Sequence, residues 1–191
     1  MNWIPDYNFI LASKSPRRQE LLKSLGIEFQ VITKDVDESY PAEISPVKIP
    51  GYLAEMKAKA FIGELNNKDL LITADTIVVL NDLVLGKPAD YEHAFQMLSA
   101  LSGNMHDVIT GVCLSSEKKT VVFSSLTKVL FKQLTKTEID YYIKTFNPYD
   151  KAGAYGIQEW IGSIGISHIE GSFYNVMGLP LQKLYEEIQK F

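Results

Sequence analysis

The alternation of apolar and polar positions predicts strands and helices in turn along most of the chain. Short apolar runs bounded by turn residues are typical of buried strands. The strands predicted in this way span residues 9–11, 28–37, 70–80, 83–85, 106–114, 120–130 and 161–169. Asn81 and Asp82 form the turn of a hairpin between residues 70–80 and 83–85.

Between these strands, apolar residues recur at helical spacing and capping residues mark the helix ends. Ser15 and Pro16 are suited to begin the first helix, and Gly26 to end it. Thr135 and Glu138 form the capping box of a later helix that Asn147 and Pro148 end. The other predicted helices are one over residues 52–65, one that Asp90 caps and Gly103 closes, and a final one that begins at residue 176, with Pro180 near its first turn.

The first helix carries two cations, Arg17 and Arg18, in its first turn. The helix dipole disfavours cations there, so the pair indicates that an anion binds at that end, and a phosphate is the obvious candidate. An ordinary capped helix with a solvated basic turn would have the same sequence. The segment Ser-Pro-Arg-Arg is also short and basic enough for a DNA groove or a phosphorylation site.

Two charged residues lie among apolar neighbours. The residues one helical turn before and after Lys57 are all apolar. Its ammonium therefore either reaches the helix edge or meets an anion, and the sequence leaves both outcomes open. Asp75 stands in the centre of the apolar run at residues 70–80. A carboxylate there needs a cation, a metal or a shifted pKa, and a functional role is favoured over a structural ion pair.

For several other polar residues, the sequence indicates a functional role less strongly. Asp35, Asp37 and Glu38 end a predicted strand, where carboxylates are usually solvated. Lys87 follows the hairpin and precedes a rigid proline, and residues 150–158 contain glycines that would let a ligand approach the backbone. The histidines have no metal-ligand spacing and are assigned no catalytic role: His93, His106 and His168.

Composition narrows the class of protein. The 191 residues are 46% hydrophobic and 22% charged, which is ordinary for one compact unit or for two lobes sharing a sheet. The 19 Lys and Arg against 23 Asp and Glu, a formal net charge of −4, argue against a duplex-binding surface. The lone Cys113, the absence of a signal-like N-terminus and the absence of a long apolar run lead us to expect a cytoplasmic protein without a membrane span.

Several motifs occur together and in order between Phe9 and Pro180: FILASKSPRR, VDE at residues 36–38, LAEMKAKA, ADT at residues 74–76, LGKP, LSG, DKAGAYGIQ and VMGLP. This combination resembles the Maf family of nucleoside triphosphate pyrophosphatases, and within it the branch that hydrolyses dTTP and UTP. The resemblance implies one Maf-like domain over residues 1–191 with an α/β fold like that of inosine triphosphatases. Such a fold has an elongated mixed sheet with flanking helices, two lobes and a central cleft. It also implies a divalent metal cation, Mg or Mn, and often a homodimer.

Carried over by position, the resemblance assigns roles to individual residues. Asp75 matches the family's proton acceptor, and Glu38 with Asp75 would hold the metal. The residues placed around the triphosphate are Ser13, Arg17, Arg18, Lys57 and Lys87. Asp150 and Lys151 match further cleft residues, and substrate choice is associated with Arg17, Thr76 and Gln158. A branch selective for methylated guanosine triphosphate usually has Trp, Gln and Glu at those last three positions. Trp160 is a mild departure, since close relatives tend to have glycine there.

The activity implied is hydrolysis of dTTP and UTP between the α- and β-phosphates, giving a nucleoside monophosphate and pyrophosphate. Such a reaction needs an activated water, a metal and fixed cations, and the sequence offers residues for each. The alternative is a non-catalytic nucleotide-binding regulator of cell division. Nucleic-acid binding through the basic segment is disfavoured by the acidic charge balance.

Overall fold

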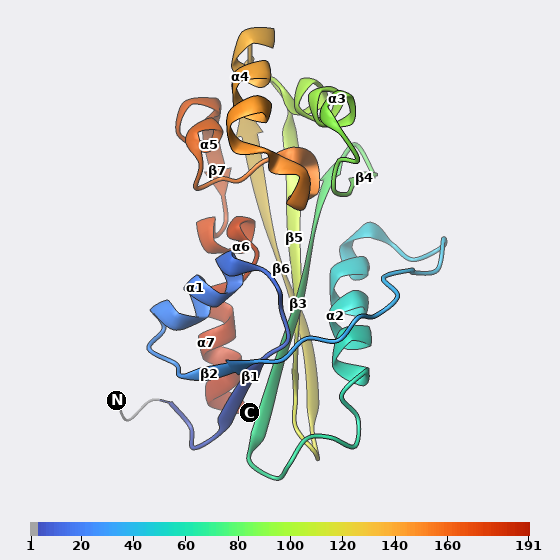
Figure 1. Ribbon diagram of the computed structural model, residues 1–191, viewed down its shortest axis with the longest axis vertical. Coiled ribbons are helices and arrows are strands. Elements are labelled where there is room, and N and C mark those ends of the chain that lie inside the picture. Colours follow the sequence, from blue (N-terminus) through green and yellow to red (C-terminus); the bar gives the residue numbers. More distant parts are fainter. Residues whose placement is uncertain (1–3) are drawn as a thin grey trace. The chain divides into compact units, whose positions relative to one another are not determined.

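A computed structural model describes residues 4–191 and contains a mixed seven-stranded sheet with flanking helices (Figure 1). The first three residues of the N-terminal segment assessed above lie outside the described residues. The strands are β1 Asn8–Leu11, β2 Phe29–Val31, β3 Asp69–Leu80, β4 Leu83–Leu85, β5 Met105–Ser115, β6 Thr120–Phe131 and β7 Ile166–Glu170. Their order is β2-β1-β3-β5-β6-β7, with β4 paired to β3. β1 pairs in parallel with β2 and β3, whereas β3–β4 and β6–β7 are antiparallel, so the sheet is mixed as predicted.

The α-helices are α1 Pro16–Ser24, α2 Ile49–Lys59, α3 Tyr91–Leu101, α4 Lys136–Phe146, α5 Trp160–Gly165, α6 Phe173–Met177 and α7 Leu181–Lys190. Short 3₁₀ turns cover Pro46–Lys48, Pro148–Asp150 and Ala152–Ala154. Among residues 4–191, no helix has both the length and the apolar content needed to cross a membrane.

The chain divides into two compact units. Unit 1 contains the described residues up to Asp75, Thr110–Ser125 and Gly178–Phe191, and unit 2 contains Thr76–Ile109 and Leu126–Met177. In unit 1, α2 lies on one side of the strands and α1 with α7 on the other (Figure 1). Each unit has its own apolar core. The core between α2 and the sheet contains Ile10, Ala54, Ala58, Phe61, Leu71 and Cys113, and the core of unit 2 includes Val78, Leu98, Phe131, Tyr142 and Ile161.

The local signals that predicted helix ends and turns are confirmed. Ser15 and Pro16 begin α1, and Gly26 follows it with the positive φ of 74° that glycine adopts without strain. The Thr135–Glu138 capping box is formed in full at the start of α4. Asn81 and Asp82 both have positive φ, 49° and 65°, as a two-residue hairpin turn requires.

Two predicted elements are shorter than their sequences indicated. The strand expected over residues 28–37 is reduced to β2, Phe29–Val31. Beyond it the polar side chains make local contacts in place of a ladder, as when Asp37 accepts hydrogen bonds from the backbone and hydroxyl of Ser39, both at 3.0 Å. The helix expected over residues 52–65 starts earlier and ends at Lys59, before Gly63 with its φ of 82°.

The strand predicted over residues 161–169 is wrong in its first half, where the chain forms α5 and only then enters β7. A short apolar run does not by itself distinguish a strand from a buried helical turn. The helical turn has no room for a side chain at Gly162, because a Cβ there would lie 1.8 Å from the carbonyl oxygen of Ile157. The final predicted helix is likewise two helices, α6 and α7, separated at Gly178, whose φ is 112°.

At Gly111 in β5, the start of α2 approaches the sheet closely. A Cβ on Gly111 would lie 2.2 Å from the backbone nitrogen of Gly51 and from the carbonyl carbon of Pro50. We expect Gly111→Ala to lower the free energy of unfolding by about 1–3 kcal/mol, because backbone atoms of α2 must move to make room. Urea unfolding measures the change. The control is Gly86→Ala, whose new Cβ meets no atom within 4 Å, and an equal loss in both variants would contradict the explanation.

Candidate active site

In unit 1, the turn between β1 and α1 places Ser13 and the two arginines at the start of a helix. Ser13 is buried, and its hydroxyl accepts a hydrogen bond from the backbone N–H of Ser15 at 3.2 Å. Arg18 donates from Nε to the carbonyl of Gly178 at 2.8 Å and from Nη1 to the carbonyl of Ala74 at 2.9 Å. These two bonds fix the Arg18 guanidinium against β3 and the segment that precedes α7.

Arg18 has both negative and positive charges near it. Burial lowers the pKa of Arg18 below its usual value, and the negative charge of Asp75 opposes that shift. The neighbouring charge of Arg17 lowers the same pKa further, whereas Glu38 raises it. Arg18 therefore stands in the field of two carboxylates and a second guanidinium.

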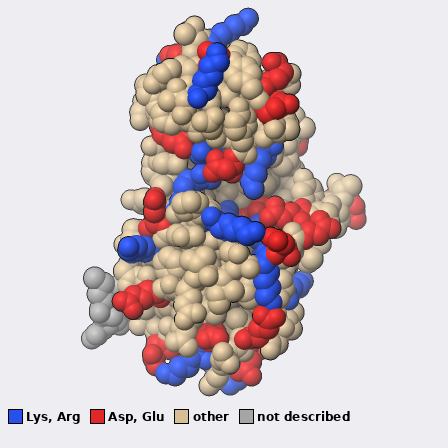
Figure 2. All heavy atoms as spheres, in the orientation of Figure 1, with Lys and Arg blue, Asp and Glu red and all other residues tan. Residues whose placement is uncertain are grey.

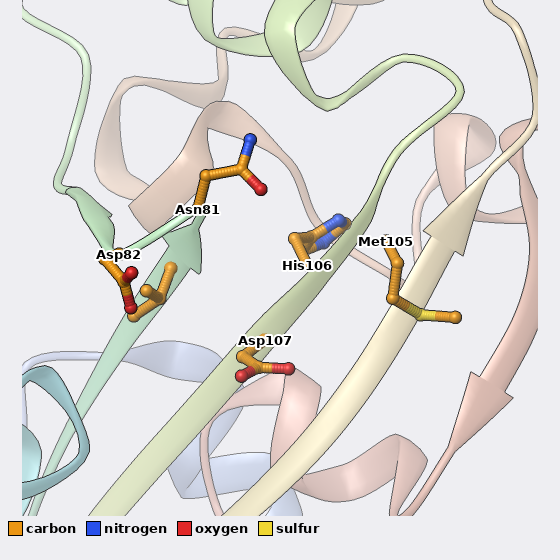
Figure 3. A pocket seen from close by; sticks show the side chains of 6 residues that line it. Asn81, Asp82, Met105, His106 and Asp107 are labelled. Atoms are coloured by element: carbon orange, nitrogen blue, oxygen red, sulfur yellow. The ribbon is translucent and has the colours of Figure 1, made fainter.

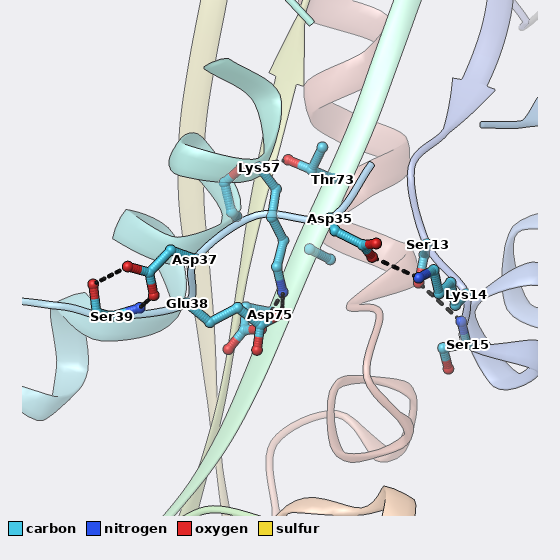
Figure 4. A network of polar contacts seen from close by, with 12 residues as sticks. Ser13, Lys14, Ser15, Asp35, Asp37, Glu38, Ser39, Lys57, Thr73 and Asp75 are labelled. Carbon is cyan, nitrogen blue, oxygen red and sulfur yellow. Dashed lines mark hydrogen bonds and ion pairs between the residues drawn. The ribbon is translucent and has the colours of Figure 1, made fainter. Parts of the chain in front are cut away.

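The two carboxylates converge on one ammonium (Figure 4). Lys57 Nζ lies 2.6 Å from Asp75 Oδ1 and 2.9 Å from Glu38 Oε1. Lys57 is 17% exposed and Asp75 13%, whereas Glu38 is 54% exposed. Of the two outcomes left open for Lys57, the structure has the anion partner, and Asp75 has the cation that its apolar strand requires.

The position of Lys57 depends on how closely α2 packs on β3. The hydroxyl of Thr73, two residues before Asp75, donates to the carbonyl of Ala54 at 2.6 Å. Ala54 and Ala58 are buried small residues at this contact, with exposures of 0% and 5%. Lys57 extends from the same helix, so the close packing brings its ammonium to the Asp75 carboxylate.

The other two carboxylates of the VDE region are separate from this group. Asp35 makes an exposed ion pair with Lys14 at 2.7 Å, and Asp37 contacts Ser39 (Figure 4). Both side chains are exposed, as predicted for carboxylates here, although β2 already ends at Val31. Of these three neighbouring acidic residues, it is Glu38 that pairs with Lys57 in the structure.

Unit 2 holds a second charged group on residues 150–159. Lys151 is buried, and its Nζ lies 2.8 Å from Asp150 Oδ1 and 3.1 Å from Glu159 Oε1. Glu159 also accepts a hydrogen bond from the hydroxyl of Tyr142 in α4. Asp150 and Lys151, the predicted further cleft residues, are therefore direct partners of each other.

The remaining predicted residues of unit 2 are Thr76, Lys87 and Gln158. Thr76 follows Asp75 in β3 and is partly buried, while Lys87 and Gln158 are exposed. The backbone N–H of Gly153 donates to the carbonyl of Gly86 at 3.0 Å, which holds the segment carrying Lys87 beside residues 152–154.

A pocket of about 210 Å³ in unit 2 lies between the hairpin turn and the start of β5 (Figure 3). Its lining residues are Val79, Asn81, Asp82, Met105, His106 and Asp107. Two carboxylates and no Lys or Arg line it, so it is unsuited to a triphosphate. His106 belongs to the core: its ring stacks on Phe131, its Nε2 lies 2.8 Å from the Tyr155 hydroxyl, and burial lowers its pKa to about 4.

Basic and acidic side chains are interspersed on the face drawn in Figure 2. This mixture does not favour a polyanion-binding surface there, in agreement with the acidic charge balance. Within residues 4–191, no group of three or more His, Cys, Asp or Glu side chains could hold a metal ion.

A family model described as "Maf-like protein" matches residues 8–191. The chain belongs to the Maf-like protein family. The family predicted from the ordered motifs is thereby confirmed. The dTTP/UTP pyrophosphatase of Parabacteroides distasonis is 54% identical over 186 residues, which cover 97% of this chain and 96% of that protein. Proteins of the same name from Porphyromonas gingivalis and Flavobacterium johnsoniae are 53% and 50% identical, over 97% and 94% of this chain and 94% and 93% of those proteins.

Among solved structures, the Ham1 protein of Staphylococcus aureus has a similar fold. The TM-score is 0.56 at 17% identity, over 96% of this chain and 98% of that one. At this identity the likeness concerns the fold alone. Together with the mixed sheet and its flanking helices, it confirms the α/β fold class predicted for this Maf-like chain.

Sequence reasoning missed Tyr142 and Glu159. The helical spacing of apolar residues predicts Tyr142 only as a core position of α4, although a tyrosine hydroxyl in a core needs a hydrogen-bond partner and that need is a usable signal. Glu159 had no signal of its own, because its partners come from other segments. Trp160, the departure from the Maf pattern, packs its ring edge-on against Tyr141 of α4 at 4.8 Å.

The ion pair changes what we expect of Lys57→Met. From its apolar neighbours alone, this substitution would keep or raise stability. With the pair present, it leaves the Asp75 carboxylate without its ammonium partner, so we expect a loss of about 1–3 kcal/mol in the free energy of unfolding. The double variant Lys57→Met/Asp75→Asn should recover part of that loss. Urea unfolding of the single and double variants tests the coupling, and strictly additive effects would argue against it.

Proposed function

We propose that this chain hydrolyses dTTP and UTP between the α- and β-phosphates, releasing a nucleoside monophosphate and pyrophosphate. The observation that carries the proposal is the group in unit 1 where Lys57 joins Asp75 and Glu38 beside Arg18. A carboxylate on a rigid strand among fixed cations suits an attack on a phosphoanhydride. The names of the relatives at 50–54% identity support the same reaction and substrate class.

The cations would bind the triphosphate. In unit 1 these are Arg17, Arg18 and Lys57, with the Ser13 hydroxyl as a further phosphate contact. The resemblance adds Lys87 to these cations. Their fixed positive charges would stabilise the negative charge that develops on the pyrophosphate leaving group, and the carbonyls that hold Arg18 reduce the cost of orienting it. Asp150 and Lys151 would complete the polar surroundings.

Asp75 would accept the proton of the attacking water. Its Oδ1 contacts Lys57, so the proton would go to Oδ2. The water oxygen then bonds to the α-phosphorus. The bond from this phosphorus to the oxygen that bridges the α- and β-phosphates breaks, and pyrophosphate leaves. Asp75 is suited to this because β3, whose residues on either side are mostly apolar and buried, holds it in place.

A divalent cation, Mg or Mn, fits the residues present. Glu38 and Asp75 would hold it, since both already converge on the single positive charge of Lys57. Two carboxylates are a common protein contribution to a magnesium site whose other ligands are waters and substrate phosphates. When bound, such a cation supplies positive charge that neutralises the phosphates and polarises them.

Gln158, Arg17 and Thr76 would select the base. The Gln158 amide has one acceptor and two donor hydrogens, which match the carbonyl and N–H edge of uracil and thymine. The thymine methyl is worth only about 1–3 kcal/mol in an apolar space, so both bases should be accepted. Cytosine has an amino group where those bases have a carbonyl, and a purine needs a larger pocket.

Three further features of the proposal come from the resemblance and the composition. They are a single Maf-like domain over residues 1–191, a homodimer and a cytoplasmic location. None of them is needed for the roles given above.

Asp75→Asn should reduce kcat by about 10²–10⁴-fold, because the amide keeps the shape of the side chain but cannot accept the proton. Pyrophosphate release from dTTP, with circular dichroism to verify folding, measures this. The matched control is Asp35→Asn, which neutralises an exposed carboxylate of the same unit that pairs with Lys14. A folded Asp75→Asn variant with near-native kcat would exclude Asp75 as the base.

Substrate choice is tested with a nucleotide panel scored as kcat/KM. The wild type should hydrolyse dTTP and UTP well and CTP, ATP and GTP much more slowly. Gln158→Glu should impair pyrimidine turnover, since a carboxylate lacks the donors that face a base carbonyl. A wild-type preference for methylated GTP, or an unchanged profile in the variant, would refute the branch assignment. Tight binding without turnover would indicate the regulatory alternative.

A further inference from the structure

The segment that carries Gln158 is held by a buried chain of hydrogen bonds in unit 2. Tyr142 of α4 is fully buried, and its hydroxyl accepts a hydrogen bond from the backbone N–H of Gly156 at 3.0 Å. The same hydroxyl donates to Glu159 Oε2. The other oxygen of Glu159 pairs with Lys151, which also pairs with Asp150. The chain thus joins both ends of the segment to the core helix α4.

The direction of these bonds is determined by the Tyr142 phenol. Burial raises the pKa of Tyr142 far above its usual value, and the hydrogen bond to Glu159 raises it further. The phenol therefore keeps its proton at neutral pH and donates it to the carboxylate. Its lone pairs then face the Gly156 N–H, so each group in the chain has a partner of the correct polarity.

Gly156 links this chain to the Gln158 side chain. A Cβ on Gly156 would lie 2.8 Å from Cδ of Glu159 and 3.0 Å from Nε2 of Gln158. Both side chains therefore fold over the bare backbone of Gly156. The Gln158 amide, the Glu159 carboxylate and the Gly156 peptide form one compact group anchored on Tyr142.

We propose that Tyr142 and Glu159 are positioning residues for base selection, holding the Gln158 amide in one orientation through Gly156. The inference rests on the proposed function, in which Gln158 reads the base. An exposed glutamine has several rotamers of similar energy, and selecting one before the substrate binds improves discrimination between bases. Neither Tyr142 nor Glu159 needs to touch the nucleotide for this effect.

The test variant is Tyr142→Phe, which removes the hydroxyl and keeps the ring that stacks on Phe146 at 5.1 Å. We expect the ratio of kcat/KM for dTTP to that for CTP to fall about tenfold, the equivalent of one lost hydrogen bond. The loss should lie mainly in KM for dTTP. Because the ratio compares two triphosphates on the same variant, any common effect on phosphate handling cancels.

The matched control is Tyr91→Phe. The Tyr91 hydroxyl donates to Asp140 at 2.5 Å, so this substitution also removes a tyrosine–carboxylate hydrogen bond in unit 2, between α3 and α4. It should leave the dTTP to CTP ratio unchanged. An equal fall in both variants would mean that general destabilisation is responsible and would overturn the proposal, as would an unchanged ratio in Tyr142→Phe.

Variants of Glu159 separate the hydrogen bond from the charge. Glu159→Gln keeps an acceptor for the Tyr142 hydroxyl and should retain most of the selectivity. Glu159→Ala removes the acceptor and should reproduce the loss in Tyr142→Phe. Equal selectivity in these two variants would contradict a positioning role for Glu159.

A measurement without substrate distinguishes failure of this inference from failure of the proposed function. In Tyr142→Phe, amide hydrogen exchange at Gly156 should be faster and the Gln158 side-chain amide resonances should shift, with neither change in Tyr91→Phe. If the wild type hydrolyses no pyrimidine triphosphate but these changes occur, the substrate assignment fails while the positioning of Gln158 stands. If exchange and resonances are unaltered, the positioning itself is refuted.

Discussion

The charge of Asp75 in the centre of an apolar strand is the constraint on which unit 1 depends. A carboxylate that is only 13% exposed needs a nearby cation, because the free energy of removing an unpaired charge from water is several kcal/mol. Lys57 supplies that cation from α2, and Arg18 adds positive charge from α1. The helix packing in this unit therefore determines whether Asp75 can be accommodated at all.

Small residues make this arrangement possible. Gly111 lets the start of α2 approach β5 without a side chain between them, and Ala54 receives a hydrogen bond from Thr73 of β3. A bulkier contact would hold the helix farther from the sheet, and the ammonium of Lys57 would no longer reach 2.6 Å from Asp75. The requirement for tight packing in the fold and the requirement for a paired charge in the site are therefore met by the same residues.

Unit 2 also contains a buried charge, that of Lys151, but accommodates it differently. Lys151 is buried and pairs with two carboxylates, and one of them, Glu159, is held in turn by the hydroxyl of Tyr142. Here a chain of hydrogen bonds supports a loop, whereas in unit 1 a helix and a strand carry the charges directly. A loop lacks a ladder of backbone hydrogen bonds, so side-chain bonds of this kind are needed to give it one conformation.

The sequence by itself determined the features that depend on neighbours along the chain: the α1 start at Ser15, the capping box at Thr135, the hairpin turn and most strands of the sheet. It also determined the family, since ordered motifs are a property of the chain alone. Only the tertiary structure decided between an anion and the helix edge for Lys57, selected Glu38 from three adjacent carboxylates, and joined Tyr142 to Glu159. It also replaced part of a predicted strand with α5, in which Gly162 packs against the backbone of Ile157. The physical reason is the same in each case: these outcomes depend on the distance between atoms of different elements, and periodicity along one element carries no information about that distance.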